Sequence, residues 1–246
     1  MSLRLSSCLA VGIAFFSQQL CVGQITLTVA AASDLTNLEP VLSSSFGKAD
    51  PGIRLRFVTA SSAILAQQIE NGAPYDVFLS ANAQYVDRLS SLGKLKPDSV
   101  QAYATGRIAM LWRDGKQHPI SDLAQKWVRF LALPNPKLAP YGVAAQQALE
   151  HAGIWKQVQP KVVYGENVRQ TLQLFESGNA DAVITSDSLL QGKGPQVIPA
   201  GWHQPIIQKA GIAAASQNGE AARKFLNFLV SAEGQAVFAQ FGFGGP

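Results

Sequence analysis

Short apolar runs alternate with amphipathic segments along this chain, and this alternation limits the possible fold more than any other feature. The runs are rich in β-branched and aromatic residues, as strands are, and lie at 25–31, 53–59 and 76–80. Each is followed by a segment with apolar residues at helical spacing, at 34–48, 62–71 and 83–92. This strand–helix order predicts a mostly parallel sheet with helices on both faces.

The same alternation continues in the second half of the chain. Further strands are predicted at 107–112, 129–133, 161–163, 180–185, 196–199 and 206–215. Further helices are predicted at 121–127, after Pro140, from Val168 to a stop at Gly178, and at 220–229 and 232–241. This number of elements favours two α/β lobes with a ligand cleft between them.

The first 23 residues have the pattern of a secretory signal peptide. Arg4 is the only charged residue among them, an apolar stretch covers 9–16, and the segment ends in small residues up to Gly23. We therefore expect cleavage before Gln24 and export to the periplasm. Both cysteines, Cys8 and Cys21, fall in this segment, so the exported chain is expected to contain no disulfide and no thiol-based site.

The charge of the chain gives no indication of a nucleic-acid partner. The formal net charge is +4, and the 20 Lys and Arg residues are scattered without a basic run. The three histidines show no metal-ligand spacing, and we interpret them as surface residues. No known catalytic motif stands out, so the sequence predicts a binding protein without a cofactor and not an enzyme.

Two serines stand where predicted strands give way to helices. Ser33 follows the first strand and Ser62 the second, and the turns at 139–142 and at Asn167 occupy matching places later in the chain. Hydroxyls and the unpaired N–H groups of helix starts bind anions without charged side chains. An ordinary N-cap is the competing interpretation for each serine alone. Four matching turns favour an oxyanion receptor.

Asp34 does not fit an anion site at first sight. Its carboxylate would repel a dianion if it pointed into the cleft. We therefore expect this side chain to cap its own helix or to pair elsewhere, while its backbone N–H faces the ligand.

The motifs at these turns resemble those of the ModA family, the periplasmic molybdate-binding receptors of ABC importers. The resemblance covers nearly the whole chain after residue 23, and the string NGAPYDVFLSA at 71–81 is its most specific part. The remaining motifs are AASDL at 31–35, SSAILAQQI at 61–69, NP at 135–136, APYG at 139–142 and ENV at 166–168.

The resemblance implies a type II periplasmic binding-protein fold. One lobe would comprise 24–104 and 205–246, and the other 105–204, with strands crossing between them. Molybdate would be held through its oxygen atoms by the hydroxyl and N–H groups of Ser33 and Ser62 and by the backbone N–H groups of Tyr141 and Val168. Asp34 would add a further N–H. Many members also use a late-strand Tyr, but the segment AVITSD at 182–187 has none. In this respect the chain is similar to a subgroup that takes its Tyr from the APYG turn.

The expected function is that of a monomeric periplasmic receptor. It would close around molybdate or tungstate and deliver the anion to the permease and ATPase components of an ABC importer. The nearest competing function is a receptor for sulfate or phosphate, and phosphate would need an acceptor such as Asp34 for its proton. An exported enzyme that uses Asp76 or Asp187 as acid or base is less favoured, as is a sensor without a transport role.

Overall fold

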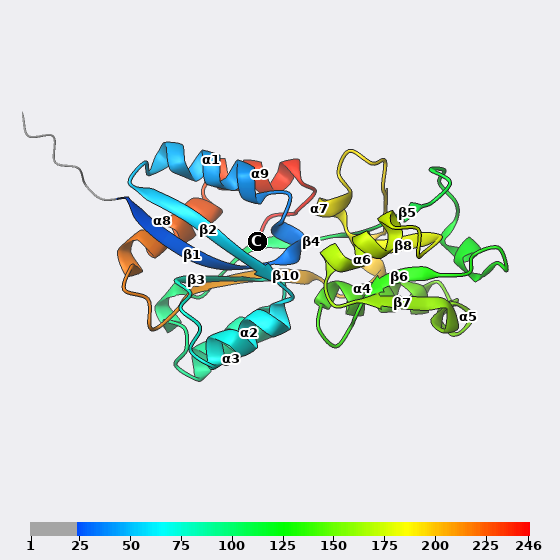
Figure 1. Cartoon of the computed structure of the whole chain (residues 1–246), viewed down its shortest axis with the longest axis horizontal. Coiled ribbons are helices and arrows are strands. Elements are labelled where there is room, and N and C mark those ends of the chain that lie inside the picture. The colour runs from blue at the N-terminus through cyan, green and yellow to red at the C-terminus, as the bar shows by residue number, and fades with distance from the viewer. Residues whose placement is uncertain (1–23) are drawn as a thin grey trace, which may run out of the picture.

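The computed structural model describes residues 24–246, which form two α/β lobes lying side by side (Figure 1). The predicted signal peptide at 1–23 and both cysteines lie outside the described residues. Within residues 24–246, none of the helices has the length and apolar character needed to cross a membrane.

Lobe 1 is built on the strands β1 (Ile25–Ala32), β2 (Ile53–Ala60), β3 (Val77–Ser80), β4 (Gln101–Gly106) and β10 (Ile206–Ile212). They form one sheet in the order β2-β1-β3-β10-β4. The β1 strand is parallel to β2 and β3, whereas β10 is antiparallel to β3 and β4. The β1–β2 register pairs Ala32 with Ala60, so the two strands end level at the same edge.

Helices cover both faces of this sheet, as the strand–helix alternation predicts (Figure 1). One face is covered by α1 (Glu39–Ala49), α8 (Gly219–Val230) and α9 (Ala232–Gln240), and the other by α2 (Ser62–Glu70) and α3 (Ala83–Ser91). Successive strand residues point to opposite faces. Val29 and Ala31 therefore pack in the core of the first face, while Ala30 packs in that of the second.

Lobe 2 contains the strands β5 (Ile108–Trp112), β6 (Leu131–Pro134), β7 (Val162–Gly165), β8 (Ala182–Ser186) and β9 (Gln196–Val197). The sheet order is β7-β6-β8-β5-β9, with β6 parallel to β7 and β8 and with β5 antiparallel to β8 and β9. Its helices are α4 (Pro140–His151), α5 (Trp155–Val158), α6 (Val168–Glu176) and α7 (Asp187–Leu190).

The two sheets confirm the predicted α/β class and the two-lobe architecture. The chain crosses from lobe 1 to lobe 2 between β4 and β5 and returns between β9 and β10. The boundaries at 104/105 and 204/205 stay a prediction. The parallel strands of both lobes end at the cleft, where each leads towards a helix start.

The prediction of a helix at 34–48 is wrong for its first residues. Ser33–Leu35 forms a separate 3₁₀ helix, η1, and α1 begins only at Glu39. Pro40 explains the break, because its ring would clash with the carbonyl four residues earlier if the helix extended back through Thr36. The helix predicted at 121–127 is likewise a 3₁₀ segment, Ile120–Ala124.

The prediction also missed β4, which carries only two β-branched or aromatic residues, Tyr103 and Thr105. Its pairing with β10, more than 100 residues later in the chain, makes it a strand. Local composition carries no information on that partner.

Candidate functional site

A small cavity lies between the lobes, where the strand-to-helix turns of both lobes meet. The space between protein atoms in it, counted out to the open solvent, is about 190 Å³, so the cavity is of the size of a small ion. No Lys, Arg or His lines it within the described chain. The lining residues are Ala32, Ser33, Asp34, Ser61, Ser62, Ala81, Ala139, Pro140, Tyr141 and Val168.

Ser62 reaches this cavity as the first residue of α2, and it is not the helix cap. The cap is Ser61, whose Oγ accepts a hydrogen bond from the Ile64 N–H at 3.4 Å. The Ser62 Oγ instead accepts the Ala81 N–H at 3.0 Å, and the residue is only 2% exposed. Because that bond uses the oxygen as acceptor, the hydroxyl proton remains available to a ligand.

Ser33 opens the 3₁₀ helix η1, and it too makes no cap. The N-cap position belongs to Ala32 and has no side-chain cap bond. Within residues 24–246 the Ser33 hydroxyl has no hydrogen-bond partner, although the residue is 95% buried. The simple capping interpretation is therefore wrong for both predicted serines.

Two helix starts in lobe 2 complete the cavity wall. Tyr141 is the second residue of α4, after Pro140, and Val168 is the first residue of α6. Within the described residues neither backbone N–H has a hydrogen-bond acceptor, as expected in a first helical turn. The Thr185 hydroxyl donates to the Val168 carbonyl at 3.0 Å and fixes this turn.

The Tyr141 side chain joins the two lobes. Its hydroxyl crosses to lobe 1 and donates to Asp34 Oδ2 at 2.7 Å, while Gln208 Nε2 donates to the same oxygen at 2.6 Å. Tyr103 donates to Gln208 Oε1 at 2.8 Å and so orients the amide. A Cβ on Gly106 would lie 2.3 Å from the Tyr141 hydroxyl, so only glycine allows this approach.

Asp34 is the centre of this network and is only 1% exposed. Of the two expectations for its side chain, pairing elsewhere is confirmed and capping is wrong. Burial raises the pKa of Asp34 above its ordinary value, while the hydrogen bonds from Tyr141 and Gln208, and the nearby backbone N–H of Asp34 itself, oppose this shift. The second carboxyl oxygen, Oδ1, is buried and has no partner in the described protein.

A second set of contacts joins the lobes beside η1. The Ser188 hydroxyl, at the start of lobe 2 helix α7, donates to the Asp34 carbonyl at 2.6 Å. Asn37 Nδ2 donates to the Ser188 carbonyl at 3.3 Å. These contacts hold the lobes together around the cavity.

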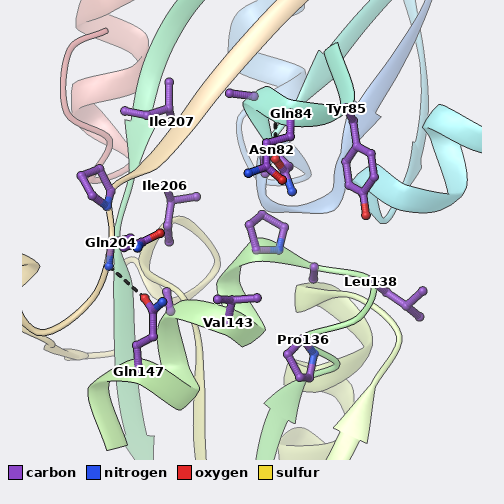
Figure 2. Close-up of a pocket in the computed structure, with 16 residues that line it drawn as sticks. Asn82, Gln84, Tyr85, Pro136, Leu138, Val143, Gln147, Gln204, Ile206 and Ile207 are labelled. Atoms are coloured by element: carbon purple, nitrogen blue, oxygen red, sulfur yellow. Dashed lines mark hydrogen bonds between the residues drawn. The ribbon is translucent and has the colours of Figure 1, made fainter. Parts of the chain in front are cut away.

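A wider pocket between the lobes lies beside the cavity (Figure 2). It shares Ala81, Ala139 and Pro140 with the cavity, so the two spaces are adjacent. Figure 2 shows Asn82, Gln84 and Tyr85 of lobe 1 across the pocket from Val143 and Leu138 of lobe 2. The space between protein atoms in this pocket, counted out to the open solvent, is about 790 Å³.

Neither aspartate considered as a catalytic acid lies in the cavity. Asp76 binds the Thr28 N–H through Oδ2 and the Ser216 hydroxyl through Oδ1, at the end of β3 that faces away from the cleft. Asp187 bonds to Gln191 at 3.0 Å, and burial raises its pKa while Arg107 lowers it. Both side chains bond within their own lobe.

The histidines lie at the surface, as predicted, since His151 is exposed and His118 and His203 are half-buried. His118 pairs with Asp114 and packs against Trp112 and Trp127, while His151 stacks on a Trp ring. Within residues 24–246, no group of three or more His, Cys, Asp or Glu side chains is arranged to hold a metal ion.

Sequence reasoning missed four residues of this site. Ser61 is adjacent to the predicted Ser62, and its position as the N-cap of α2 is the signal that could have identified it. Tyr103, Ser188 and Gln208 gave none, because each acts through a contact with a distant part of the chain.

Comparisons with known proteins agree with this architecture. A family model of bacterial extracellular solute-binding proteins matches residues 27–244. The chain is 30% identical to the putative ABC transporter substrate-binding lipoprotein YvgL of Bacillus subtilis (strain 168), over 89% of this chain and 86% of that protein. It is 29% identical to the molybdate-binding protein ModA of Azotobacter vinelandii, over 91% of this chain and 92% of that protein.

Solved structures show the same relationship. The periplasmic molybdate-binding protein of Azotobacter vinelandii superposes with a TM-score of 0.83 at 28% identity, covering 89% of this chain and 99% of that chain. The sulfate-binding protein SubI of Mycobacterium tuberculosis H37Rv has a TM-score of 0.74 at 16% identity, which shows the shared fold alone. With its two-lobe type II fold, the chain therefore belongs to the bacterial extracellular solute-binding proteins, as a member of the ModA family.

Proposed function

We propose that this protein is the extracytoplasmic receptor of an ABC importer and binds molybdate, and also tungstate. The observation that carries the proposal is the convergence of the Ser33 and Ser62 hydroxyls with the free N–H groups of Tyr141 and Val168 around one ion-sized cavity. The ModA relatives, named as molybdate-binding proteins, support the choice of anion.

Neutral donors in this cavity are suited to bind and release a dianion. Hydrogen bonds to a charged acceptor are stronger than neutral ones, and several oriented donors replace the hydration shell of the anion. The donors are divided between the lobes, so separation of the lobes removes about half of them at once. Release therefore needs no change in the charge of the donors.

Cavity size is the proposed basis of selectivity. Molybdate and tungstate are larger than sulfate and have the same charge and shape. The four donors therefore distinguish these two anions from sulfate by the distance between the donors. Phosphate is the second candidate, because the unpartnered Asp34 Oδ1 would accept the proton that phosphate carries.

The proposal extends to cellular context. The receptor would be exported by its N-terminal signal, act as a monomer and deliver its ligand to the permease and ATPase components of the importer. N-terminal sequencing of protein from the cell envelope should begin near Gln24. An intact Met1 on that material would contradict export with cleavage.

Calorimetric titration of residues 24–246 with molybdate, tungstate, sulfate and phosphate tests the anion preference. We expect one site per chain, with molybdate and tungstate bound more tightly than sulfate by at least about tenfold, or about 1.4 kcal/mol. Tighter binding of phosphate than of molybdate would move the assignment to the second candidate. No binding of any of the four anions would refute an oxyanion receptor.

A further inference from the structure

The buried carboxyl group of Asp34 presents a physical difficulty for an anion receptor. It lines the cavity, is 1% exposed, and forms no ion pair with any Lys, Arg or His in the described chain. A carboxylate and a dianion in one dry cavity would repel each other strongly. Either the carboxyl group or the anion must therefore carry a proton when the site is occupied.

The hydrogen bonds around Asp34 determine where that proton lies. Oδ2 already accepts from Tyr141 at 2.7 Å and from Gln208 at 2.6 Å, which occupies both of its lone pairs. Gln208 presents its NH₂ group to Asp34 because its carbonyl oxygen faces the Tyr103 hydroxyl. Oδ1 is the only carboxyl oxygen left, and it is buried without a partner in the described chain.

We propose that the oxyanion binds together with one proton, which is held between Asp34 Oδ1 and an oxygen atom of the anion. This inference rests on the proposed function. For molybdate, the ionised carboxyl group takes one proton from solvent, and the resulting Oδ1–H donates to the dianion. No bond other than O–H forms or breaks. An anion that brings its own proton satisfies Oδ1 without uptake from solvent.

The groups that pack against Asp34 agree with this assignment. Tyr141 on α4 and Tyr103 on β4 are its titratable neighbours, and burial raises the pKa of both phenols well above 10, so they remain donors. From α7, Ser188 faces the Asp34 carbonyl while Asp187 turns to Gln191. Arg169 on α6, which also packs against η1, forms no ion pair with Asp34.

The assignment also gives Asp34 a role in selectivity. A site with a fixed proton donor at Oδ1 favours fully deprotonated anions at low pH, when Asp34 is neutral. The same site favours protonated anions at high pH, when Asp34 is ionised. The anion preference should therefore change with pH in a way that four neutral donors alone would not produce.

Proton uptake during molybdate binding tests the inference directly. We would titrate the wild-type protein with molybdate in buffers of different ionisation enthalpy, across a pH series. We expect uptake of one proton per anion, and a Kd that rises up to tenfold per pH unit above the pKa of Asp34 in the unliganded protein. Tight binding of molybdate with no proton uptake at any pH overturns the inference and leaves the proposed function intact.

An Asp34→Asn variant provides the second test. Its amide oxygen can accept from Tyr141 and Gln208, and its NH₂ group imitates the protonated Oδ1. We expect it to bind molybdate at least as tightly as wild type, with no proton uptake and a flat pH profile. Asp187→Asn is the matched control, because Asp187 is also buried with a raised pKa but lies outside the cavity, and it should keep the uptake of one proton. A wild-type pH profile in Asp34→Asn would overturn the inference, whereas failure of the wild-type protein to bind any tetrahedral oxyanion would overturn the proposed function with it.

Discussion

The two lobes contribute different kinds of donor to the same cavity. Lobe 1 provides the hydroxyl side chains of Ser33 and Ser62, while lobe 2 provides the backbone N–H groups of Tyr141 and Val168. The lobe 2 donors stand at the starts of α4, with 12 residues, and α6, with 9 residues. The Ser33 turn is a 3₁₀ helix of only 3 residues. At the Ser33 turn the side chain must therefore provide what the helix start provides in lobe 2, whereas Ser62 is itself the first residue of α2, a helix of 9 residues.

This difference arises although the two sheets have the same plan. The three parallel strands lie in the order β2-β1-β3 in lobe 1 and β7-β6-β8 in lobe 2. A fourth strand is antiparallel to the last of these, β10 beside β3 in lobe 1 and β5 beside β8 in lobe 2. Each parallel strand ends at the cleft and leads towards a helix start. The backbone topology thus fixes where donors stand, and the residue at each turn decides which kind they are.

Removal of the lobe 1 hydroxyls should have the largest effect. The Ser33→Ala, Ser62→Ala double variant loses two hydrogen bonds to a charged ligand, each of about 1.5–3 kcal/mol. Molybdate affinity measured by calorimetry should fall by at least roughly a hundredfold. Folding stability should fall by about 1–3 kcal/mol, because Ser62→Ala leaves the buried Ala81 N–H without its acceptor.

Ser99→Ala is the matched control for this variant. Ser99 is a buried serine of lobe 1, 2% exposed, that accepts the Ile212 N–H and does not line the cavity. The Ser99→Ala variant should be less stable than wild type but should bind molybdate with wild-type affinity. Wild-type molybdate affinity in the double serine variant would refute the site.

A backbone donor of lobe 2 can be removed by Val168→Pro. Proline is favoured at the first position of a helix, and Asn167 before it is extended, with φ −151° and ψ 172°. The change removes the N–H while it keeps the helix start. Molybdate affinity should fall by about 1.5–3 kcal/mol, the range for one hydrogen bond to a charged group.

Ala232→Pro is the control at an equivalent position. Ala232 is the exposed first residue of α9, after the extended Ser231, and is remote from the cleft. The molybdate affinity of the Ala232→Pro variant should equal that of wild type. If Val168→Pro binds equally well, lobe 2 makes no contact through this N–H, and the division of donors between the lobes is wrong.

Tyr141→Phe should have the smallest effect on affinity, within about threefold of wild type. The hydroxyl reaches Asp34 and not the cavity, and the variant keeps the N–H at the helix start. Loss of a donor to a buried carboxyl group should instead lower the free energy of unfolding by about 1–3 kcal/mol. Thermal denaturation and calorimetry separate the two effects. A loss of affinity as large as that of Val168→Pro would make the hydroxyl a ligand, in place of the late-strand Tyr that this chain lacks.

Much of the candidate site could be predicted from local sequence. Strand-forming runs followed by Ser33, Ser62 and Asn167 place helix starts where they are found, because such signals act over only a few residues. Local signals failed where a nearby residue changes the backbone. Pro40 prevents α1 from starting at residue 34, where the apolar spacing placed its first turn. Ser61 caps α2, although the adjacent Ser62 is an equally good capping residue type.

The sequence by itself determined the order of most strands and helices, the two-lobe class and the positions of the serine-bearing turns. These follow from periodicity and capping preferences, which are properties of short segments. Only the tertiary structure decided the partners of Asp34, since Tyr141 is 107 and Gln208 is 174 residues away along the chain. The physical reason is that a hydrogen bond depends on distance and direction to within a few tenths of an ångström. Such precision arises only when distant segments of the chain pack together, within lobe 1 for Gln208 and between the lobes for Tyr141.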